Sequence, residues 1–498
     1  MTQPDARSGR SSQIFWAFVA AHVAVWTLLP ILFHPNAPLD VVEQVSWGRE
    51  WQMGYYKHPP LAAWLTNAVY LATGGKLWSI FLLSQSAIAV CFWAVWKLAN
   101  EIVDETRALA SVLLLEGVLY FSFTSPEFNP NVLELPMWAL VALFAWRALK
   151  RGRLADWALL GVCAGLGLWT KYYTGVLLLA LFVFLIADRD ARKAFRTAGP
   201  YAAFILALLT FSPHVAWMIA HRFSTVTYAV ARAEGSRTLA THITYPLSFA
   251  AAQLLAVALA LIVFTVLFGI WRRKIDVGVE DGSTASRMAA RYLIAMALGP
   301  FAITLFISVL FNWKLRAMWG TPLWFLLPLL LLATGDIKSE RMKRVPLVLA
   351  TLIVGFVLAQ AFVLPLTVGP YVYKPRKALF PGEMMGKVVT EEWRHQTLEP
   401  LVYVVGDTWM AGNMAFYSPD RPSTLTDGDE RLSPWIDMQT LRRYGGVIVW
   451  EGENDLPASY RSRFPSAIVQ SAIKLPWRTQ AKIPPAVVHW AIIPPSQQ

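Results

Sequence analysis

Long apolar segments recur along this chain, and they constrain its fold more than any other feature. A helix needs roughly 17–25 apolar residues to cross a bilayer core. Segments of about this length, two of them short, predict eleven membrane spans: 15–33, 77–96, 108–124, 131–149, 154–169, 173–187, 199–219, 245–270, 292–311, 317–334 and 346–367. The stretch from Pro59 to Thr73 is shorter and amphipathic, and it predicts a helix lying in the membrane interface. The expected fold is an α-helical polytopic membrane protein with about 11–13 transmembrane helices.

The composition agrees with a membrane protein and excludes other classes. Of the 498 residues, 56% are apolar and only 15% are charged, whereas soluble domains carry about 25% charged residues. Mean hydropathy is +0.44. The 23 Trp and 27 Phe residues exclude a disordered chain. Both cysteines, Cys91 and Cys163, lie within apolar segments, so we expect packing roles and neither a disulfide nor a metal site.

The distribution of Lys and Arg predicts the orientation. With the N-terminus (1–14) in the cytoplasm, the six cytoplasmic segments hold 21 of these residues, and the opposite loops hold nine over a greater length. Cytoplasmic loops of membrane proteins are enriched in Lys and Arg. The net charge of +12 is therefore explained by topology, and no nucleic acid is implied. Arg7 and Arg10 before the first apolar segment also resemble a signal peptide, but the segment is long and lacks a small-residue cleavage site, which favours an uncleaved helix.

The composition changes after about Val368, where Pro, Gly and charged residues increase and the apolar spans stop. The transmembrane region is expected to cover 15–368, and residues 369–498 to form a small α/β domain outside the membrane, on the periplasmic side. Leu401–Gly406, Gly446–Trp450 and Val487–Ile493 are predicted strands, with a helix at Thr408–Tyr417. The role of this domain has no motif to indicate it.

The first predicted outside loop, 34–76, contains acidic residues that topology does not require. Asp40 and Glu43 are three residues apart, so they share one face of a helix. Four aromatic residues follow that suit a membrane interface, namely Trp47, Trp51, Tyr55 and Tyr56. An amphipathic surface helix with solvated acids is the alternative interpretation.

Further outside loops add an acid and several cations. Glu127 lies beside Asn129 and Asn131, and Glu134 follows one turn deeper. The turn between two apolar segments holds Lys171 and Tyr172, and a later loop holds Lys314 and Arg316. Contact with lipid headgroups is an alternative role for these cations. Glu116, within a predicted span, is interpreted as a structural acid paired with a cation elsewhere.

Acids, cations and aromatic residues at one membrane face suit the transfer of a group from a phosphate-linked lipid. A carboxylate can deprotonate the acceptor hydroxyl, and cations, or a metal held by acids, can stabilise the leaving phosphate. The chain contains no Walker A loop, no GxGxxG after a strand, no HExxH and no CxxC. We therefore expect no nucleotide cofactor and a lipid-carried donor.

Four segments in order resemble motifs of the bacterial C-type glycosyltransferases, of the family 39 and 83 kind. DVVEQVSWGREWQMGYYKHPPLAAW resembles the first outside loop of that group, TSPEFNPN its second acidic motif, LGLWTKYYTG its Ser-Lys-Tyr turn, and MWGTPLW a later Asn-Trp-x-x-Pro element. The resemblance covers about residues 15–335. The group includes lipid A aminoarabinose and galacturonic acid transferases and, more distantly, dolichyl-phosphate-mannose protein O-mannosyltransferases. It implies the GT-C fold.

The resemblance also implies roles for individual residues. Asp40 would be the general base and Glu127 the second acid, near acceptor or metal. Lys171 and Tyr172 would face the donor phosphate, and His58 would line the same cavity. The chain departs from the pattern at Val41, where the group has Glu, and at His58, where the aminoarabinose branch has Lys. These changes place the chain nearer the galacturonosyl branch and leave the sugar open.

The sequence thus predicts a bacterial inner-membrane glycosyltransferase with its site at the periplasmic face. It would move a sugar from a polyprenyl phosphate to an envelope glycolipid such as lipopolysaccharide, with inversion at the anomeric carbon. Lys314 and Arg316 are further candidates for the donor phosphate. A divalent metal on Asp40, Glu43 and Glu127 is plausible because hard oxygen ligands suit such ions. The alternatives are a protein O-glycosyltransferase and a transporter or flippase of lipid-linked sugars.

Overall fold

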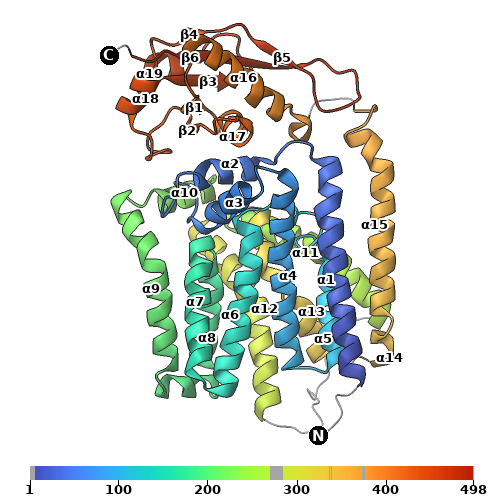
Figure 1. Ribbon diagram of the computed structural model, residues 1–498. Coiled ribbons are helices and arrows are strands. Elements are labelled where there is room, and N and C mark those ends of the chain that lie inside the picture. The colour runs from blue at the N-terminus through green and yellow to red at the C-terminus, as the bar shows by residue number, and fades with distance from the viewer. Residues whose placement is uncertain (1–5, 270–283, 336, 338, 373–375, 497–498) are drawn as a thin grey trace. The chain divides into compact units, whose positions relative to one another are not determined.

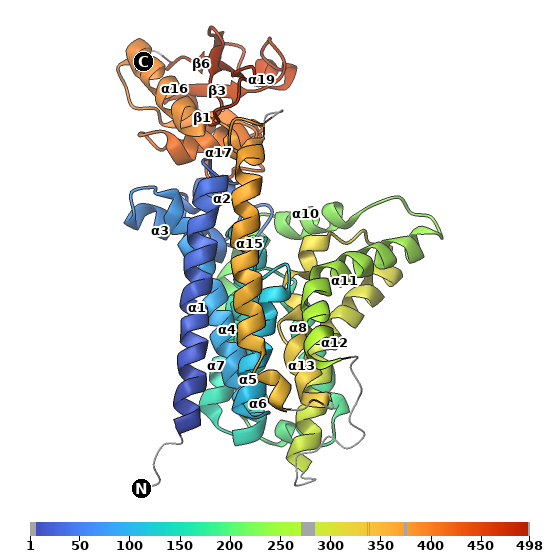
Figure 2. The ribbon, with the colours of Figure 1, turned by 90° about the vertical axis from the view of Figure 1, so that its right-hand side faces the viewer.

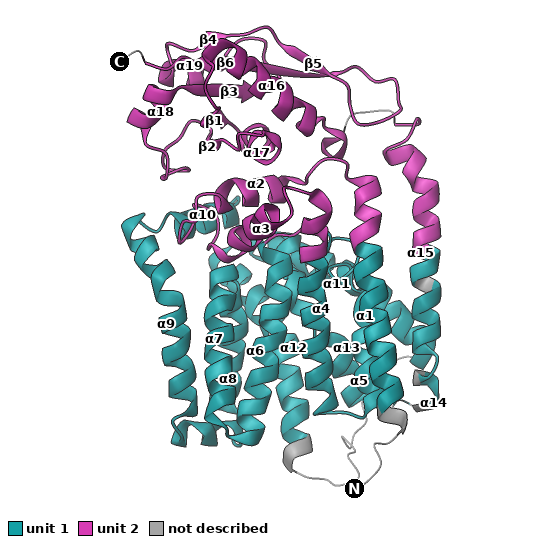
Figure 3. Ribbon diagram, in the orientation of Figure 1, with its two compact units in different colours: residues 1–26, 84–126, 130–355 teal, residues 27–83, 127–129, 356–498 magenta. Residues whose placement is uncertain are grey.

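The computed structural model describes residues 6–269, 284–335, 337, 339–372 and 376–496. It divides into two compact units, which Figure 3 shows in different colours. Unit 1 comprises residues 1–26, 84–126 and 130–355, and unit 2 comprises 27–83, 127–129 and 356–498. Three helices contribute residues to both units: α1 (Ala6–Phe33), α4 (Leu77–Asn100) and α15 (Val345–Thr367).

Unit 1 is helical, and most of its long helices run side by side (Figures 1 and 2). Helix α7 packs against both α6 and α9, and α8 packs against α12. Small residues allow the close approach of α7 and α9. The two helices are so close that a Cβ at Gly161 would lie 2.3 Å from the Ala203 carbonyl oxygen. The helices of this unit are α5 (Glu105–Leu113), α6 (Pro130–Arg151), α7 (Leu154–Thr170), α8 (Thr174–Ala187), α9 (Gly199–Ala220), α10 (Ser224–Ala233), α11 (Thr241–Phe268), α12 (Thr284–Phe311), α13 (Leu327–Thr334) and α14 (Ser339–Met342), with the 3-10 helices η1 (Leu114–Gly117), η2 (Ala191–Arg196) and η3 (Ala317–Trp324).

Within the described residues, seven helices are long and apolar enough to cross a membrane, or eight if the bent pair η3 and α13 forms one span. The chain is therefore a polytopic membrane protein, with fewer full-length spans than the eleven expected. Two expected spans correspond to the shorter apolar helices α7 and α8. The segment 317–334 is bent by 43° between η3 and α13.

The segment 108–124 corrects one prediction, because it is not a continuous helix. Helix α5 ends at Leu113 and is followed by η1 and turns. The backbone here bonds to another helix, with the Leu119 amide donating to the Ala256 carbonyl at 2.8 Å. Gly117 lies so close to α11 that a Cβ would be 2.8 Å from the Cα of Ala260. Tertiary contacts therefore interrupt an apolar pattern that by itself favours a span.

Unit 2 combines the first outside loop with the C-terminal region. Helices α2 (Leu39–Gly48) and α3 (Leu61–Ala72) come from the loop. They pack so closely that a Cβ at Gly48 would lie 2.2 Å from the Ala63 carbonyl oxygen. Helix α3 confirms the helix expected at residues 59–73, whereas its placement in the membrane interface stays a prediction.

The C-terminal region contains a sheet of mixed direction in the order β2-β1-β3-β6-β4, with β5 also paired to β6. β1 pairs in parallel with β2 and β3, and β6 runs antiparallel to β3, β4 and β5. The strands are β1 (Tyr403–Gly406), β2 (Ser423–Thr426), β3 (Gly446–Trp450), β4 (Ile468–Val469), β5 (Ile473–Leu475) and β6 (Ala486–Ile493), and the helices are α16 (Gly382–Thr397), α17 (Thr408–Tyr417), α18 (Met438–Tyr444) and α19 (Ala458–Arg463), with the 3-10 helix η4 (Lys377–Leu379). The three predicted strands and the predicted helix are confirmed.

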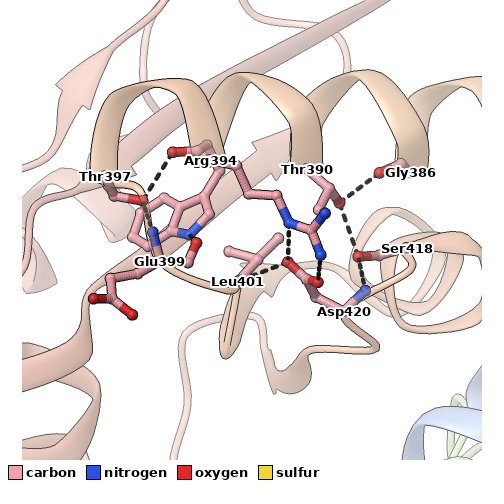
Figure 4. A network of polar contacts seen from close by, with 9 residues as sticks. Gly386, Thr390, Arg394, Thr397, Glu399, Leu401, Ser418 and Asp420 are labelled. Atoms are coloured by element: carbon pink, nitrogen blue, oxygen red, sulfur yellow. Dashed lines mark hydrogen bonds and ion pairs between the residues drawn. The ribbon is translucent and has the colours of Figure 1, made fainter.

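Polar contacts attach α16 to the segments around β1 and α17 (Figure 4). Arg394 forms an ion pair with Asp420, whose carboxylate also accepts a hydrogen bond from the Leu401 amide at 2.7 Å. One turn earlier, the hydroxyls of Thr390 and Ser418 lie 2.8 Å apart. Helix α16 is thereby fixed to the loop that leads out of α17, the helix that contacts α2.

Candidate functional site

Asp40 and Glu127 lie together in unit 2, although 87 residues separate them in the sequence. Asp40 is in the first turn of α2, and its backbone amide donates to Glu127 Oε1 at 3.4 Å. Its side chain accepts a hydrogen bond from Asn129 Nδ2 at 2.9 Å. The residue types that the sequence singled out in two separate loops therefore form one cluster.

The start of α2 provides a physical reason for this cluster. The first amides of a helix have no acceptor within the helix, and the N-terminal end of the helix dipole favours negative charge. Pro38 caps α2 without a side-chain hydrogen bond, so the Glu127 carboxylate serves as acceptor for an early amide. Asp40 lies in this first turn, where a carboxylate could act as a general base.

The pKa of Glu127 differs strongly from its ordinary value. Burial and the neighbouring charge of Asp40 raise the pKa of Glu127 to about 7, against the smaller opposing effect of the Asp40 amide. A carboxyl group with a pKa near 7 can hold or release a proton at neutral pH. Glu127 therefore has the protonation behaviour of a group that can take part in proton transfer.

Glu43 is one turn along α2, and Lys57 is its ion-pair partner. Burial raises the pKa of Glu43 to about 7, although Lys57 acts in the opposite direction. Burial lowers the pKa of Lys57, but Glu43 outweighs this effect, and the Lys57 pKa lies above its usual value. The Lys57 ammonium also lies 5.8 Å from the Trp47 ring centroid and 5.2 Å from that of Tyr56.

The two acids on α2 therefore have different partners, which bears on the expected metal site. Asp40 and Glu127 contact one another through a backbone amide, whereas Glu43 is directed to Lys57. In the described part of the chain, no three His, Cys, Asp or Glu side chains are grouped so that they could hold a metal ion. Asp40, Glu43 and Glu127 in this arrangement do not fit a metal site. A requirement for a metal stays an untested prediction.

The aromatic residues after Asp40 correct another expectation. Trp47 and Tyr55 are stacked at 5.2 Å between ring centroids, and Tyr55 contacts the ring of Trp435 in the C-terminal region. Trp47 and Tyr55 are almost completely buried and Tyr56 is buried, whereas Trp51 is well exposed. Most of the predicted interfacial residues thus form the interior of unit 2. His58 lies beside them, 6.4 Å from the Trp47 ring centroid.

In unit 1, the turn between α7 and α8 holds Lys171 next to the start of α6. Lys171 Nζ donates to Asn131 Oδ1 at 2.5 Å and lies 3.5 Å from Glu134 Oε2. Glu134 is completely buried. An ammonium group beside a buried carboxylate and an amide has a fixed position and a partly balanced charge.

Tyr172 points to a different set of residues in unit 1. Its hydroxyl lies 2.6 Å from His214 Nε2 and 2.7 Å from Thr225 Oγ1. Neither partner was singled out by the sequence, because each lies within or after an apolar helix without a recognisable motif. The neighbouring residues Lys171 and Tyr172 therefore belong to separate polar clusters.

Lys314 and Arg316 follow α12. Lys314 is exposed, and its amide donates to the Ala233 carbonyl at 2.8 Å. Arg316 is partly buried and precedes η3. The Lys314 ammonium lies 6.0 Å from the Tyr245 ring centroid, and the proposed role of both cations stays a prediction. Glu116, in contrast, is paired as expected, with His22 Nδ1 at 2.6 Å from Glu116 Oε2.

Residues of the C-terminal region hold the start of α2, and no sequence motif indicated them. The Ala37 amide donates to the Tyr417 hydroxyl at 2.8 Å, and Asn36 Nδ2 donates to Asn413 Oδ1 at 3.0 Å. Further along α2, the Ser46 and Thr424 hydroxyls are 2.7 Å apart. The helix that bears Asp40 is thus positioned by residues almost 400 places later in the sequence.

The chain is similar to known proteins in sequence and in fold. Residues 57–217 match the family model described as dolichyl-phosphate-mannose-protein mannosyltransferase. The lipopolysaccharide core galacturonosyltransferase RgtA of Rhizobium johnstonii is 25% identical over 484 residues, which cover 94% of this chain and 93% of the relative. An undecaprenyl phosphate-alpha-4-amino-4-deoxy-L-arabinose arabinosyl transferase of Pectobacterium atrosepticum is 29% identical over 168 residues, 31% of this chain and 29% of that one.

A solved structure is similar over nearly the whole length. The crystal structure of ArnT from Cupriavidus metallidurans bound to undecaprenyl phosphate matches 97% of this chain and 99% of its own, with a TM-score of 0.60 and 14% identity. At this identity the likeness shows a shared fold.

Proposed function

We propose that this chain is a membrane glycosyltransferase that transfers a sugar from a polyprenyl phosphate to a glycolipid of the lipopolysaccharide type. The match to the mannosyltransferase family model and the likeness to RgtA support this proposal. The name of the galacturonosyltransferase relative supports the acceptor, and the names of the aminoarabinose transferases support the carrier. We place the reaction at the periplasmic face, because the loops that hold Asp40, Glu127 and Lys171 are all predicted on the side opposite the basic loops.

The observation that carries this proposal is the position of Asp40 at the start of α2, beside Glu127 and Asn129. Asp40 accepts the proton of the acceptor hydroxyl, whose oxygen attacks the anomeric carbon of the donor. The bond from that carbon to the phosphate oxygen breaks, and the polyprenyl phosphate leaves with the electron pair. A single displacement of this kind inverts the anomeric configuration.

Asn129 and Glu127 assist by holding the base and its helix. The Asn129 amide orients the Asp40 carboxylate, and Glu127 fixes the helix backbone at Asp40. For the donor phosphate we propose Lys171 as the counter-charge, because Asn131 and Glu134 fix its ammonium group. The family resemblance also assigns Tyr172 and His58 to the donor.

Mass spectrometry of envelope lipids tests the proposal in strains that express the wild type, no protein, or the Asp40→Asn variant. A matched control is Asp455→Asn, because Asp455 is an exposed acid of the C-terminal region. We expect the deletion to lose one sugar-sized mass increment from lipopolysaccharide, and the increment to return with wild type and Asp455→Asn but not with Asp40→Asn. The size of the increment distinguishes a uronic acid from an aminopentose or a hexose.

Two outcomes contradict the proposal in different ways. Restoration of the increment by Asp40→Asn would show that another group is the base, or that the protein moves lipid-linked sugar without breaking a bond. An unchanged lipid profile in the deletion strain would remove the glycolipid acceptor, and glycosylated envelope proteins would then be compared between the same strains.

A further inference from the structure

Two arginines from distant parts of the chain converge in unit 2. Arg49 follows the last turn of α2, and its Nε donates to Ser423 Oγ at 3.3 Å. Arg421 lies two residues before Ser423 and donates through Nη2 to Asn67 Oδ1 at 3.1 Å. The Arg421 guanidinium also lies over the Tyr70 ring, 4.7 Å from its centroid. Both guanidiniums are thus held around the same part of α3 and β2.

The charges of this cluster are not balanced. Glu50 is the acid next to Arg49, with 3.6 Å between Arg49 Nε and Glu50 Oε1. Burial lowers the pKa of Arg49, Glu50 opposes this effect, and the charge of Arg421 lowers the pKa further. Since a guanidinium does not lose its proton in proteins, the two cations repel one another, and one carboxylate does not neutralise both.

Hydrogen bonding and backbone conformation point to a missing partner. Arg421 Nε is buried and has no hydrogen-bond acceptor among the described residues, so it can donate to a ligand. Arg421 also has a φ of 50°, a left-handed conformation that is unfavourable for a residue other than glycine. Such strain collects at ligand-binding sites. The Arg49 side chain remains 31% exposed, so a ligand can reach it.

We propose that Arg49 and Arg421 form an anion-binding site that holds a phosphate or carboxylate group of the acceptor glycolipid. A guanidinium can donate two parallel N–H bonds to two oxygens of a phosphate or a carboxylate. The identity of the acceptor rests on the function proposed above. The donor phosphate is a poor occupant, because nine residues of helix separate Arg49 from Asp40, about 14 Å along the axis, whereas the leaving phosphate must lie beside the reacting carbon. The site recognises an acceptor group remote from the hydroxyl that receives the sugar.

Binding of purified lipopolysaccharide to the detergent-solubilised full-length chain tests this site without requiring transfer. The variants are Arg49→Gln, Arg421→Gln and the double variant, and Arg431→Gln is the matched control, because Arg431 is exposed and pairs only locally with Asp429. A hydrogen bond to a charged group corresponds to about a tenfold to hundredfold change in affinity. We expect a loss of this size for each arginine and an unchanged Kd for the control.

Two modified acceptors identify the source of the anion. Phosphate-free lipopolysaccharide and carboxyl-reduced lipopolysaccharide are compared with the intact molecule. Removal of the recognised group weakens binding to the wild type at least tenfold and leaves binding to the double variant unchanged. If neither modification changes wild-type binding, or if both arginine variants bind like Arg431→Gln, the site is not an acceptor site.

Stability and transfer measurements separate this outcome from misfolding and from failure of the proposed function. Arg49→Lys and Arg421→Lys retain the charge but not the paired N–H groups, so we expect them to fold with an unchanged Tm and to bind with intermediate affinity. In transfer assays the acceptor KM rises in the arginine variants, while the donor KM stays constant. A protein that binds lipopolysaccharide through these arginines but transfers no sugar would contradict the proposed function and not the anion site.

Discussion

Glu127 offers a test that separates a functional carboxyl group from a structural one. Its pKa of about 7 in the folded protein, against an ordinary value of 4.5, means that the folded state disfavours its charge. The difference between these two pKa values corresponds to about 3 kcal/mol of free energy. This is an upper limit, because the side chain is partly exposed and water screens its charge.

The sign of the pH dependence follows from proton binding. Between pH 4.5 and pH 7 the folded protein binds a proton at Glu127 that the unfolded chain has already released, so this residue lowers stability as pH rises. The unfavourable effect is complete above pH 7. Glu127→Gln keeps an acceptor for the Asp40 amide and removes the charge. We therefore expect the variant to be more stable than wild type at pH 8, by up to about 3 kcal/mol, and to gain much less at pH 5.

Thermal unfolding of the detergent-solubilised protein at pH 5 and pH 8 measures this difference, with Glu453→Gln as the exposed matched control. Transfer assays on the same samples test whether the Glu127 carboxyl group contributes to the reaction. If the carboxyl group serves the reaction, kcat/KM falls at least tenfold although stability rises, which is the usual relation between an active-site group and stability. An equal change in Tm at both pH values would refute the reasoning about burial and Asp40, and a stable, fully active variant would show that Glu127 only caps α2.

Two other contacts of the site lead to shorter predictions. Lys57→Gln leaves the buried Glu43 without its ion-pair partner and is expected to lower the free energy of unfolding by about 1–3 kcal/mol. In thermal unfolding at pH 8, the double variant with Glu43→Gln should regain part of this loss. Additive losses in the double variant would contradict the coupling between the two residues. Tyr417→Phe leaves the buried Ala37 amide without an acceptor. Because small displacements of a catalytic group are costly, we expect kcat to fall about tenfold with both KM values unchanged, whereas Tyr371→Phe, at an exposed tyrosine, should behave like wild type.

The sequence pattern predicted local structure well where local interactions decide it. The strands β1, β3 and β6 and the helix α17 were expected from short apolar runs between turn residues, and they form within a few residues of the predicted ends. The pattern was wrong at 108–124, because the contacts of η1 with α11 cannot be read from a local apolar run.

In the candidate site, too, the sequence predicted local features and did not predict contacts between distant segments. The spacing of Asp40 and Glu43 correctly placed both on one helix, and their acidic side chains indicated a functional role for the loop. Their partners are different, Glu127 and Asn129 for the first and Lys57 for the second, because contacts between distant segments select one orientation for each side chain. Tyr417, which binds the start of α2, had no signal at all, since a tyrosine at the end of a buried helix resembles any other packing residue.

The sequence by itself determined that the chain enters a membrane, which segments carry apolar helices and which loops carry the reactive residue types. These properties follow from apolar length and from the types of residue in the loops, which need no knowledge of neighbours. Only the tertiary structure decided that Glu127 accepts a bond from the backbone of Asp40, that Arg49 and Arg421 converge, and that the C-terminal region holds α2. Such contacts depend on how elements far apart in the sequence pack, and that packing sets both the pKa of Glu127 and the charge around the arginines.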